Sequence, residues 1–215
     1  MLKNFFIQPT EAYSAMSAEE YRKLVQYAQN EINCWGFVYN LVHDLKFELE
    51  EILDTDDIYA QRWLYLRATR PNVDGQEAVG WHREEMYGTP KGTWNFWMPA
   101  LNVTPENAIK YIPGSENAET EIVQEQDPQT PKGSAGHEIG LNYAPKRIVG
   151  GVDFTDARPM PAGLGDVAVF NGSLIHGAAV NRTDKIRFSI DFRLISKENL
   201  KQQHYASGRE YFAAI

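Results

Sequence analysis

The sequence predicts a mainly β protein, either a sandwich, a jelly roll or a barrel, whose helices are confined to residues 1–57. Beyond them the chain consists of short runs rich in aromatic and β-branched residues, which are separated by Pro, Gly and Asn with no helical pattern between them. Before residue 57 apolar residues instead recur at helical spacing. A length of 215 residues fits one domain with a substantial core, which we expect to span residues 1–215.

Two amphipathic segments predict the N-terminal helices. Over residues 16–33 apolar positions recur every three to four residues, and Ser17 with Glu20 forms a capping-box pattern at the start. Gly36 interrupts the pattern, and a shorter helical run follows that ends at the acidic turn 54–57. We expect these helices to pack on the β core.

Six runs carry the strand pattern within an expected core over residues 58–195. The polar stretch 116–151 is too long for an ordinary connection, so we expect it to act as a lid over a binding site. Residues 196–215 form a C-terminal tail. The predicted strands are 61–69, 78–82, 94–101, 108–112, 166–171 and 186–195.

Charge and composition restrict the partners and the compartment. With 29 acidic and 21 basic residues the net charge is −8, which would repel a phosphate backbone, so we expect no nucleic-acid partner. No run approaches the roughly 18 apolar residues that a membrane span needs, so we expect no membrane partner. The single cysteine, Cys34, excludes an internal disulfide, and the N-terminus lacks a signal-peptide pattern, which favours the cytoplasm.

The triplet His82-Arg83-Glu84 contains the first two candidate metal ligands. On a strand, period-two alternation places His82 and Glu84 on one face and Glu85 on the other. His176, which follows a predicted buried strand and a turn, is the third candidate. Two histidines and one carboxylate form the facial triad typical of non-haem Fe(II) oxygenases, which leaves three coordination positions open. Zinc is disfavoured because no further His or Cys stands at a suitable spacing.

The strand that begins near Arg187 carries a candidate anion site. Alternation places Arg187, Ser189, Asp191 and Arg193 on one face, opposite a row of apolar residues. A guanidinium with a hydroxyl two residues further on can hold a carboxylate through charge-assisted hydrogen bonds. The pair Arg187 and Ser189 therefore suits a dicarboxylate whose other end chelates the iron. We expect Asp191 and Arg193 to pair with neighbouring charges rather than to touch a substrate.

These motifs, in this order, resemble the phytanoyl-CoA dioxygenase-like family of Fe(II)/2-oxoglutarate-dependent oxygenases. The resemblance covers residues 63–195, and the order and spacing are far more specific than any one motif. The motifs that carry it are His82-x-Glu84, Trp97 to Leu101, Ile112 to Ser115, Gly165-Asp166-Val167, Phe170 to Gly177 and Arg187-x-Ser189.

The resemblance implies a double-stranded β-helix, a cupin-like jelly roll with the N-terminal helices packed on the barrel and iron near its open end. It implies that Arg187 and Ser189 hold the distal carboxylate of 2-oxoglutarate, with Trp97 and Asn95 lining the cosubstrate pocket. The implied cofactors are Fe(II), 2-oxoglutarate and O₂, and the implied activity is that of a biosynthetic dioxygenase that hydroxylates a small molecule with release of succinate and CO₂. Glu84 stands where aspartate is the commoner ligand in the family, and a carboxylate there disfavours halogenation.

Four residues are candidates for substrate contact: Arg67, Arg83, Tyr87 and, in the lid-like loop, His137. Desaturation, ring closure and epimerisation begin with the same hydrogen abstraction as hydroxylation, so the sequence leaves all four reactions open. Two other functions also remain open, namely a non-enzymatic jelly-roll module that binds a small anionic ligand and a cupin-like metal hydrolase or isomerase. A homo-oligomer is equally compatible with the sequence.

Overall fold

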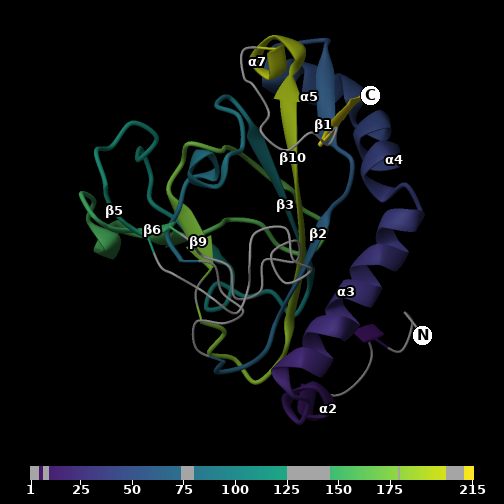
Figure 1. Ribbon diagram of the computed structural model, residues 1–215, viewed down its shortest axis with the longest axis vertical. Coiled ribbons are helices and arrows are strands. Elements are labelled where there is room, and N and C mark those ends of the chain that lie inside the picture. Colours follow the sequence, from purple (N-terminus) through teal and green to yellow (C-terminus); the bar gives the residue numbers. More distant parts are fainter. Residues whose placement is uncertain (1–4, 7–9, 74–79, 125–145, 179, 202–210) are drawn as a thin grey trace.

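The fold, seen in a computed structural model of the chain, places helices on one side of antiparallel sheets (Figure 1). The structure describes residues 5–6, 10–73, 80–124, 146–178, 180–201 and 211–215. No helix among these residues combines the length and the apolar composition needed to cross a membrane. The helices are α2 (Thr10–Ser14), α3 (Ala18–Cys34), α4 (Phe37–Asp44), α5 (Lys46–Leu53) and α7 (Lys197–Lys201), with short 3₁₀ helices η1 (Glu84–Tyr87) and η2 (Phe154–Asp156).

Helix α3 begins at the capping box that the sequence predicts. The hydroxyl of Ser17 accepts from the backbone N–H of Glu20, and the Glu20 carboxylate accepts from the backbone N–H of Ser17. The helix ends at Cys34, whose side chain is exposed. Gly36 then adopts a left-handed conformation (φ 64°), so a new helix starts after it. The predicted second helix is in fact two, α4 and α5, which meet at Leu45.

The larger sheet has six strands and is centred on the long strand β10. Strand β3 pairs with one side of β10, while β1 and β2 pair with successive parts of its other side; β11 adds to β1 and β8 adds to β3. Every pairing is antiparallel. The strands are β1 (Ile58–Gln61), β2 (Tyr65–Thr69), β3 (Trp94–Leu101), β8 (Ala168–Asn171), β10 (Arg187–Ser196) and β11 (Phe212–Ala214).

Two smaller antiparallel sheets complete the described part of the chain, and none of the sheets there closes into a barrel. One has the order β7-β4-β9, and the other is the pair β5-β6, which occupies the ends of the predicted lid. The middle of that lid, residues 125–145, lies outside the described residues, as do residues 78–79 of a predicted strand. The strands are β4 (Ile109–Tyr111), β5 (Glu121–Gln124), β6 (Lys146–Gly150), β7 (Arg158–Pro159) and β9 (His176–Ala178).

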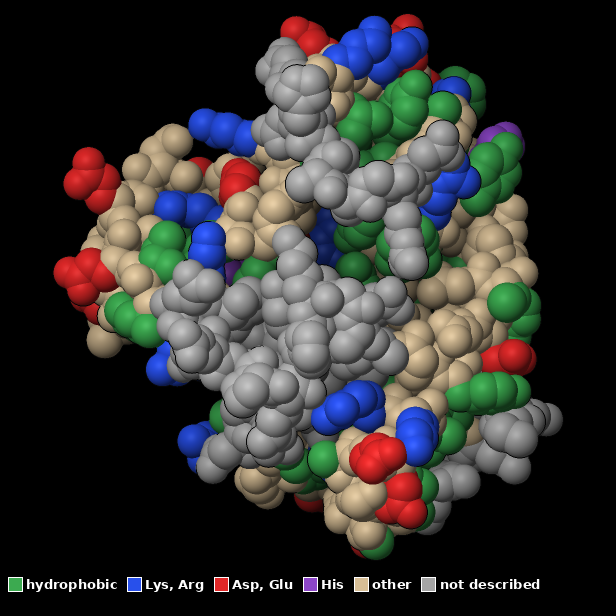
Figure 2. All heavy atoms as spheres, viewed as in Figure 1, with side chains coloured by type: hydrophobic (Ala, Val, Ile, Leu, Met, Phe, Trp, Pro, Cys, Tyr) green, Lys and Arg blue, Asp and Glu red, His purple; other side chains and the backbone are tan. Residues whose placement is uncertain are grey.

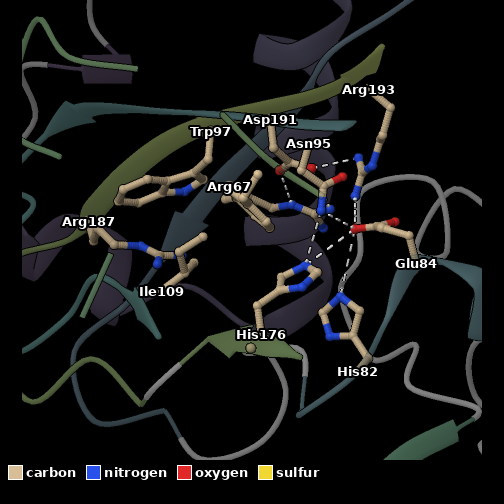
Figure 3. A pocket seen from close by; sticks show the side chains of 12 residues that line it. Arg67, His82, Glu84, Asn95, Trp97, Ile109, His176, Arg187, Asp191 and Arg193 are labelled. Carbon is tan, nitrogen blue, oxygen red and sulfur yellow. Dashed lines mark hydrogen bonds and ion pairs between the residues drawn. The ribbon is translucent and has the colours of Figure 1, made fainter. Parts of the chain in front are cut away.

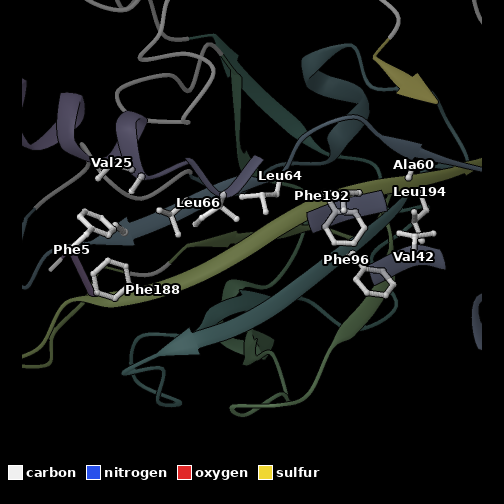
Figure 4. Close-up of a cluster of buried hydrophobic side chains, with 14 of the residues drawn as sticks. Phe5, Val25, Val42, Ala60, Leu64, Leu66, Phe96, Phe188, Phe192 and Leu194 are labelled. Atoms are coloured by element: carbon white, nitrogen blue, oxygen red, sulfur yellow. The ribbon is translucent and has the colours of Figure 1, made fainter. Parts of the chain in front are cut away.

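The main hydrophobic core lies between the N-terminal helices and one face of the larger sheet (Figure 4). Buried residues of α3, such as Val25, contact the apolar face of the sheet, to which β10 contributes Phe188, Phe192 and Leu194. Alternation along β10 turns its charged residues to the opposite face, away from the helices. The sequence prediction of a mainly β protein with helices packed on it is therefore confirmed.

On the face shown in Figure 2, acidic and basic side chains are interspersed.

Candidate metal centre

A cavity of about 520 Å³, counted with its open mouth, lies on the polar face of the larger sheet (Figure 3). Side chains of both the six-stranded and the three-stranded sheet line it, from strands β2, β3, β8 and β10 of the first and β4 and β9 of the second. The start of η1 and the residues just before it also contribute. The lining residues are Arg67, His82, Glu84, Asn95, Trp97, Ile109, Phe170, His176, Gly177, Arg187, Asp191 and Arg193.

His82 and His176 are brought together by their own backbones. Each residue donates its backbone N–H to the carbonyl of the other, at 2.9 and 3.1 Å, which makes an isolated antiparallel bridge. The two imidazole rings lie with their centroids 4.3 Å apart. At Gly177 a Cβ would come within 3.1 Å of the Gly80 carbonyl oxygen, so this close approach of the two segments requires glycine.

Glu84 reaches the same place from a turn and not from a strand, which corrects the sequence prediction. It is the first residue of η1, and its backbone N–H donates to the Gly172 carbonyl at 2.9 Å. A Cβ on Gly172 would lie 3.0 Å from the Thr93 carbonyl oxygen and 3.2 Å from the Cβ of Glu84. Period-two alternation failed because the chain leaves the extended conformation directly after Arg83.

The two imidazoles bond to the backbone through Nδ1 and turn Nε2 toward the cavity, where Asn95 Nδ2 lies 3.4 Å from Nε2 of His176. Nδ1 of His82 lies 2.7 Å from the carbonyl oxygen of Gly80, and Nδ1 of His176 lies 2.9 Å from that of Leu174. Because a carbonyl only accepts, each Nδ1 carries the hydrogen and each Nε2 presents a lone pair to the cavity. Burial, and then the neighbouring His176, lowers the pKa of His82 to about 3, which keeps this imidazole neutral.

The carboxylate of Glu84 completes a compact set of three ligand atoms. The two Nε2 atoms and a carboxylate oxygen all lie within 4.8 Å of one another, and Glu84 Oε1 is 3.4 Å from Nε2 of His176. Oε1 also accepts from Asn95 Nδ2 at 3.0 Å and from Arg193 Nη2 at 2.9 Å. Burial alone would raise the pKa of Glu84, but the Arg193 guanidinium holds it well below its usual range, so the carboxylate is ionised.

A chain of alternating charges leads away from Glu84 across the sheet. Arg193 Nη1 donates to Asp191 Oδ2 at 2.6 Å, and Arg67 Nε donates to Asp191 Oδ1 at 2.6 Å. Burial opposes ionisation of Asp191, yet the two arginines lower the pKa of this carboxyl group. The expectation that Asp191 and Arg193 pair with neighbouring charges is confirmed, although both also line the cavity.

Arg187 lies at the opposite side of the cavity from His82 and Glu84 (Figure 3). Its side chain is almost fully buried, and its two terminal nitrogens donate to neutral acceptors, Thr69 Oγ1 at 2.8 Å and the Asn107 carbonyl at 3.2 Å. Within the described residues no carboxylate pairs with it, and its Nε has no partner. Burial and the nearby Arg67 lower the pKa of Arg187 to about 10, so it remains a cation at neutral pH.

Several side chains in and around the cavity carry buried polar atoms without a partner. They are unusual, because buried polar groups in folded proteins are nearly always hydrogen-bonded. The atoms, among the described residues, are Arg187 Nε, Ser189 Oγ, Trp97 Nε1, Asn95 Oδ1 and Arg193 Nε.

The donor set fits a divalent metal, and the rest of the cavity fits an anion beside it. Two imidazoles and one carboxylate are the ligands of a facial triad. Three arginines and two carboxylates line the cavity, which leaves one excess positive charge when the imidazoles are neutral. The unpaired cation is Arg187, and Trp97, whose Nε1 has no partner, also lines the cavity. Ser189, two residues after Arg187 on β10, is buried but is not among the lining residues.

The four candidates for substrate contact have different positions. Arg67 lines the cavity. Arg83 does not, because its guanidinium donates to the carbonyls of Ser173, Ser115 and Ala118 and so links three segments. Tyr87 packs its ring 5.0 Å from that of His82 and donates to the Lys146 carbonyl, also without lining the cavity. His137 lies outside the described residues.

Sequence reasoning missed Arg193 as a member of the site. Alternation had already placed it on the face of Arg187 and Ser189, which was the available signal. Its contact with Glu84 depends on a turn whose geometry the sequence does not display. The predicted pocket residues Trp97 and Asn95 both line the cavity.

The family model described as Phytanoyl-CoA dioxygenase (PhyH) matches residues 9–189. No curated protein matches the chain.

Solved structures with similar folds include EvdO2 from Micromonospora carbonacea var. aurantiaca, in complex with 2-oxoglutarate. It is 17% identical, with a TM-score of 0.50 over 68% of this chain and 56% of its own. Another is the non-heme monooxygenase ThoJ in its apo form, 16% identical, with a TM-score of 0.46 over 67% of this chain and 51% of its own. The chain thus spans little more than half the length of these two proteins.

Proposed function

Because the chain belongs to the phytanoyl-CoA dioxygenase family, whose members use Fe(II), 2-oxoglutarate and O₂, we propose that it is an oxygenase that hydroxylates a small molecule. The observation that carries the proposal is the pairing of two features in one cavity. A compact set of two histidines and a glutamate lies at one side, and a buried arginine without a carboxylate partner lies at the other. A metal and a chelating dicarboxylate would satisfy both.

We assign the three metal ligands to His82, Glu84 and His176. The two imidazoles present Nε2 because their Nδ1 atoms donate to backbone carbonyls, and this second bond also fixes the plane of each ring. Glu84 supplies the single negative charge of the set. When bound, Fe(II) and 2-oxoglutarate supply the oxidising chemistry that inserts one oxygen atom of O₂ into a substrate bond, with release of succinate and CO₂.

We assign the distal carboxylate of 2-oxoglutarate to Arg187 and Ser189. Arg187 lines the cavity and Ser189 is buried two residues further along β10, and each has a hydrogen-bonding atom without a partner among the described residues. A carboxylate here would neutralise Arg187, whose present partners are neutral oxygens. Trp97 and Asn95 lie on the adjacent strand β3 of the same sheet and form the wall beside the cosubstrate.

The same proposal interprets the sheets as the two walls of a double-stranded β-helix. The six-stranded sheet carries Arg187, and the three-stranded sheet carries His176 at the start of β9. The isolated bridge between His82 and His176 connects the segment before η1 to the second wall. The cavity lies where the two walls approach each other.

The test is an anaerobic titration of the protein with Fe(II) and then with 2-oxoglutarate. We expect a weak visible absorption band from charge transfer between the metal and the bound cosubstrate, and succinate release when O₂ is admitted. Absence of both would favour a non-enzymatic module that binds an anion. Turnover without O₂ would favour a metal hydrolase or isomerase. A succinate screen against a panel of small molecules would then identify the substrate.

A further inference from the structure

We propose that Arg193 is a positioning residue of the metal centre, which orients the carboxylate of Glu84 toward His82 and His176. The inference rests on the proposed function, because it concerns the same three ligands. Its direct observation is that Arg193 Nη2 donates to Glu84 Oε1 at 2.9 Å, while the same oxygen lies 3.4 Å from Nε2 of His176. Arg193 thus holds the oxygen that faces the histidines.

Arg193 is itself held in place by the charge chain on the sheet. Its second terminal nitrogen donates to Asp191 Oδ2 at 2.6 Å, and Arg67 binds the other oxygen of Asp191. The guanidinium also lies over the ring of Tyr65, 5.2 Å from the ring centroid. The side chains of Arg193 and Glu84 are less than one-tenth exposed. An arginine fixed by two carboxylates and an aromatic ring can orient Glu84 because it has little freedom of its own.

The planar guanidinium suits this position better than an ammonium group would. One terminal nitrogen reaches Glu84 and the other reaches Asp191, so the fork connects two carboxylates from different segments. A lysine has a single charged nitrogen, so it could bind the carboxylates of both Glu84 and Asp191 only if these two groups moved closer together. Arg193→Lys should therefore keep the charge and lose part of the orientation.

The glutamate and the arginine form a matched pair. The backbone of Glu84 is fixed by its hydrogen bond to Gly172, so the reach of the carboxylate depends on the side chain alone. An aspartate would end one methylene, about 1.5 Å, short. It could not approach both Arg193 and the histidines from the same backbone position. The extra methylene of Glu84 therefore favours metal binding only while Arg193 restrains this longer and more flexible side chain.

Metal affinity tests the proposal without requiring turnover. Mn(II) is titrated anaerobically into the full chain and followed by electron paramagnetic resonance, and Fe(II) is followed by quenching of tryptophan fluorescence. We expect Arg193→Met to raise the dissociation constant about 10- to 100-fold, the range typical of residues that orient metal ligands. Arg193→Lys should restore part of the loss. In Arg158→Met, which removes an exposed cation on β7 that does not line the cavity, we expect a change of less than about threefold.

A double-mutant cycle with Glu84→Asp separates orientation from a general loss of packing. In the parent chain Glu84→Asp should weaken Mn(II) binding about tenfold or more. In the Arg193→Met background it should cost less than about twofold more, because the contact is already gone. If the loss of Mn(II) affinity in the double variant equals the product of the two single losses, the two residues act independently and the matched pair is overturned. A shifted visible band of the Fe(II) and 2-oxoglutarate complex in Arg193→Lys would report the altered ligand directly.

The outcomes distinguish this inference from the proposed function. If the parent chain binds neither Mn(II) nor Fe(II), the proposed function fails. If the parent chain binds metal and Arg193→Met binds it equally well or more tightly, only the positioning role is overturned, and Arg193 acts merely as a compensating charge. If Arg193→Met does not fold, as judged by circular dichroism, the comparison of Arg193→Lys with the parent chain decides the question in the same way.

Discussion

The two sides of the cavity are built in different ways. At the metal side, His82 is held by an isolated bridge to His176, and Glu84, at the start of a 3₁₀ turn, by a backbone hydrogen bond to Gly172. At the opposite side, Arg187 and Ser189 project from the regular strand β10. The candidate ligands His82 and Glu84 already have protein partners, whereas Arg187 Nε and Trp97 Nε1 at the opposite side have none among the described residues. The comparison teaches that one side is prepared for a small cation and the other for a hydrogen-bonding anion.

The largest effect should come from Glu84→Ala, which removes the only carboxylate of the triad. We expect metal affinity and succinate release to fall roughly 1000-fold, equivalent to about 4 kcal/mol. Metal titration and a succinate assay measure the two losses. Glu85→Gln is the matched control, because the Glu85 carboxylate bonds to Ser173 and does not line the cavity. Undiminished metal binding in Glu84→Ala would remove Glu84 from the ligand set.

Asp191→Asn should destabilise the fold by about 3 kcal/mol, because it leaves two buried arginines without their shared carboxylate. The pKa of Asp191 is lowered in the folded state. Its carboxylate therefore stabilises the protein above its unfolded pKa of about 3.9, and this contribution is lost as the pH falls through the folded value. Urea unfolding from pH 7 down to pH 3 should show a shrinking difference between the two proteins. A difference independent of pH would contradict this role.

Arg187→Met tests the other side of the cavity alone. We expect the dissociation constant for 2-oxoglutarate to rise about 100-fold, since a charge-assisted pair is lost, while metal affinity changes by less than about twofold. Calorimetry with Mn(II) and then 2-oxoglutarate measures both in one sample. Arg158→Met, at an exposed site on β7, serves as the control. Equal losses for metal and cosubstrate would show that the two sides do not act separately.

Gly172→Ala should weaken metal binding indirectly, because the added methyl group would displace Glu84. The added Cβ would meet the Thr93 carbonyl oxygen at 3.0 Å and the Glu84 side chain at 3.2 Å, so Glu84 must shift. We expect about 1–2 kcal/mol lower stability and about tenfold weaker metal binding. Gly163→Ala is the matched control, because its new Cβ would meet only Asp166, at 3.6 Å. Weakened 2-oxoglutarate binding with intact metal binding would contradict the placement of Gly172.

The smallest effect should come from Ser17→Ala, which removes the cap of α3 far from the cavity. The loss of the capping bonds should cost about 1 kcal/mol of stability. Because the helix packs on the opposite face of the sheet, metal and 2-oxoglutarate affinities should stay the same. Thermal unfolding and the same two titrations provide the measurement. A changed affinity would show that the helical layer influences the cavity.

The difference between the two sides also explains what the sequence could predict. Strand β3 begins and ends where the pattern places it, and β10 does so within one residue, because buried alternation in regular strands is visible in residue order. The capping box of α3 was equally readable. The side chains of His82 and Glu84 do converge, as predicted. The predicted strand conformation of Glu84 was wrong, because this residue begins a 3₁₀ helix.

What the sequence could not predict depends on contacts between distant segments. Arg193 meets Glu84 across 109 positions of chain, and no local pattern records that distance. The length and polar composition of residues 116–151 predicted a lid. Strands β5 and β6 at its ends were not predicted, because they are short and largely exposed and lack the apolar alternation that identifies a strand. In both cases the information lies in tertiary packing.

The exposed end of α3 has a practical consequence for studying this molecule. Cys34 is the chain's one cysteine, and it lies in the helical layer, which the core separates from the cavity. A maleimide nitroxide would therefore attach at one defined point without any engineered substitution. With Mn(II) in the cavity, the relaxation of that spin label would measure the distance between the two and so locate the ion in solution.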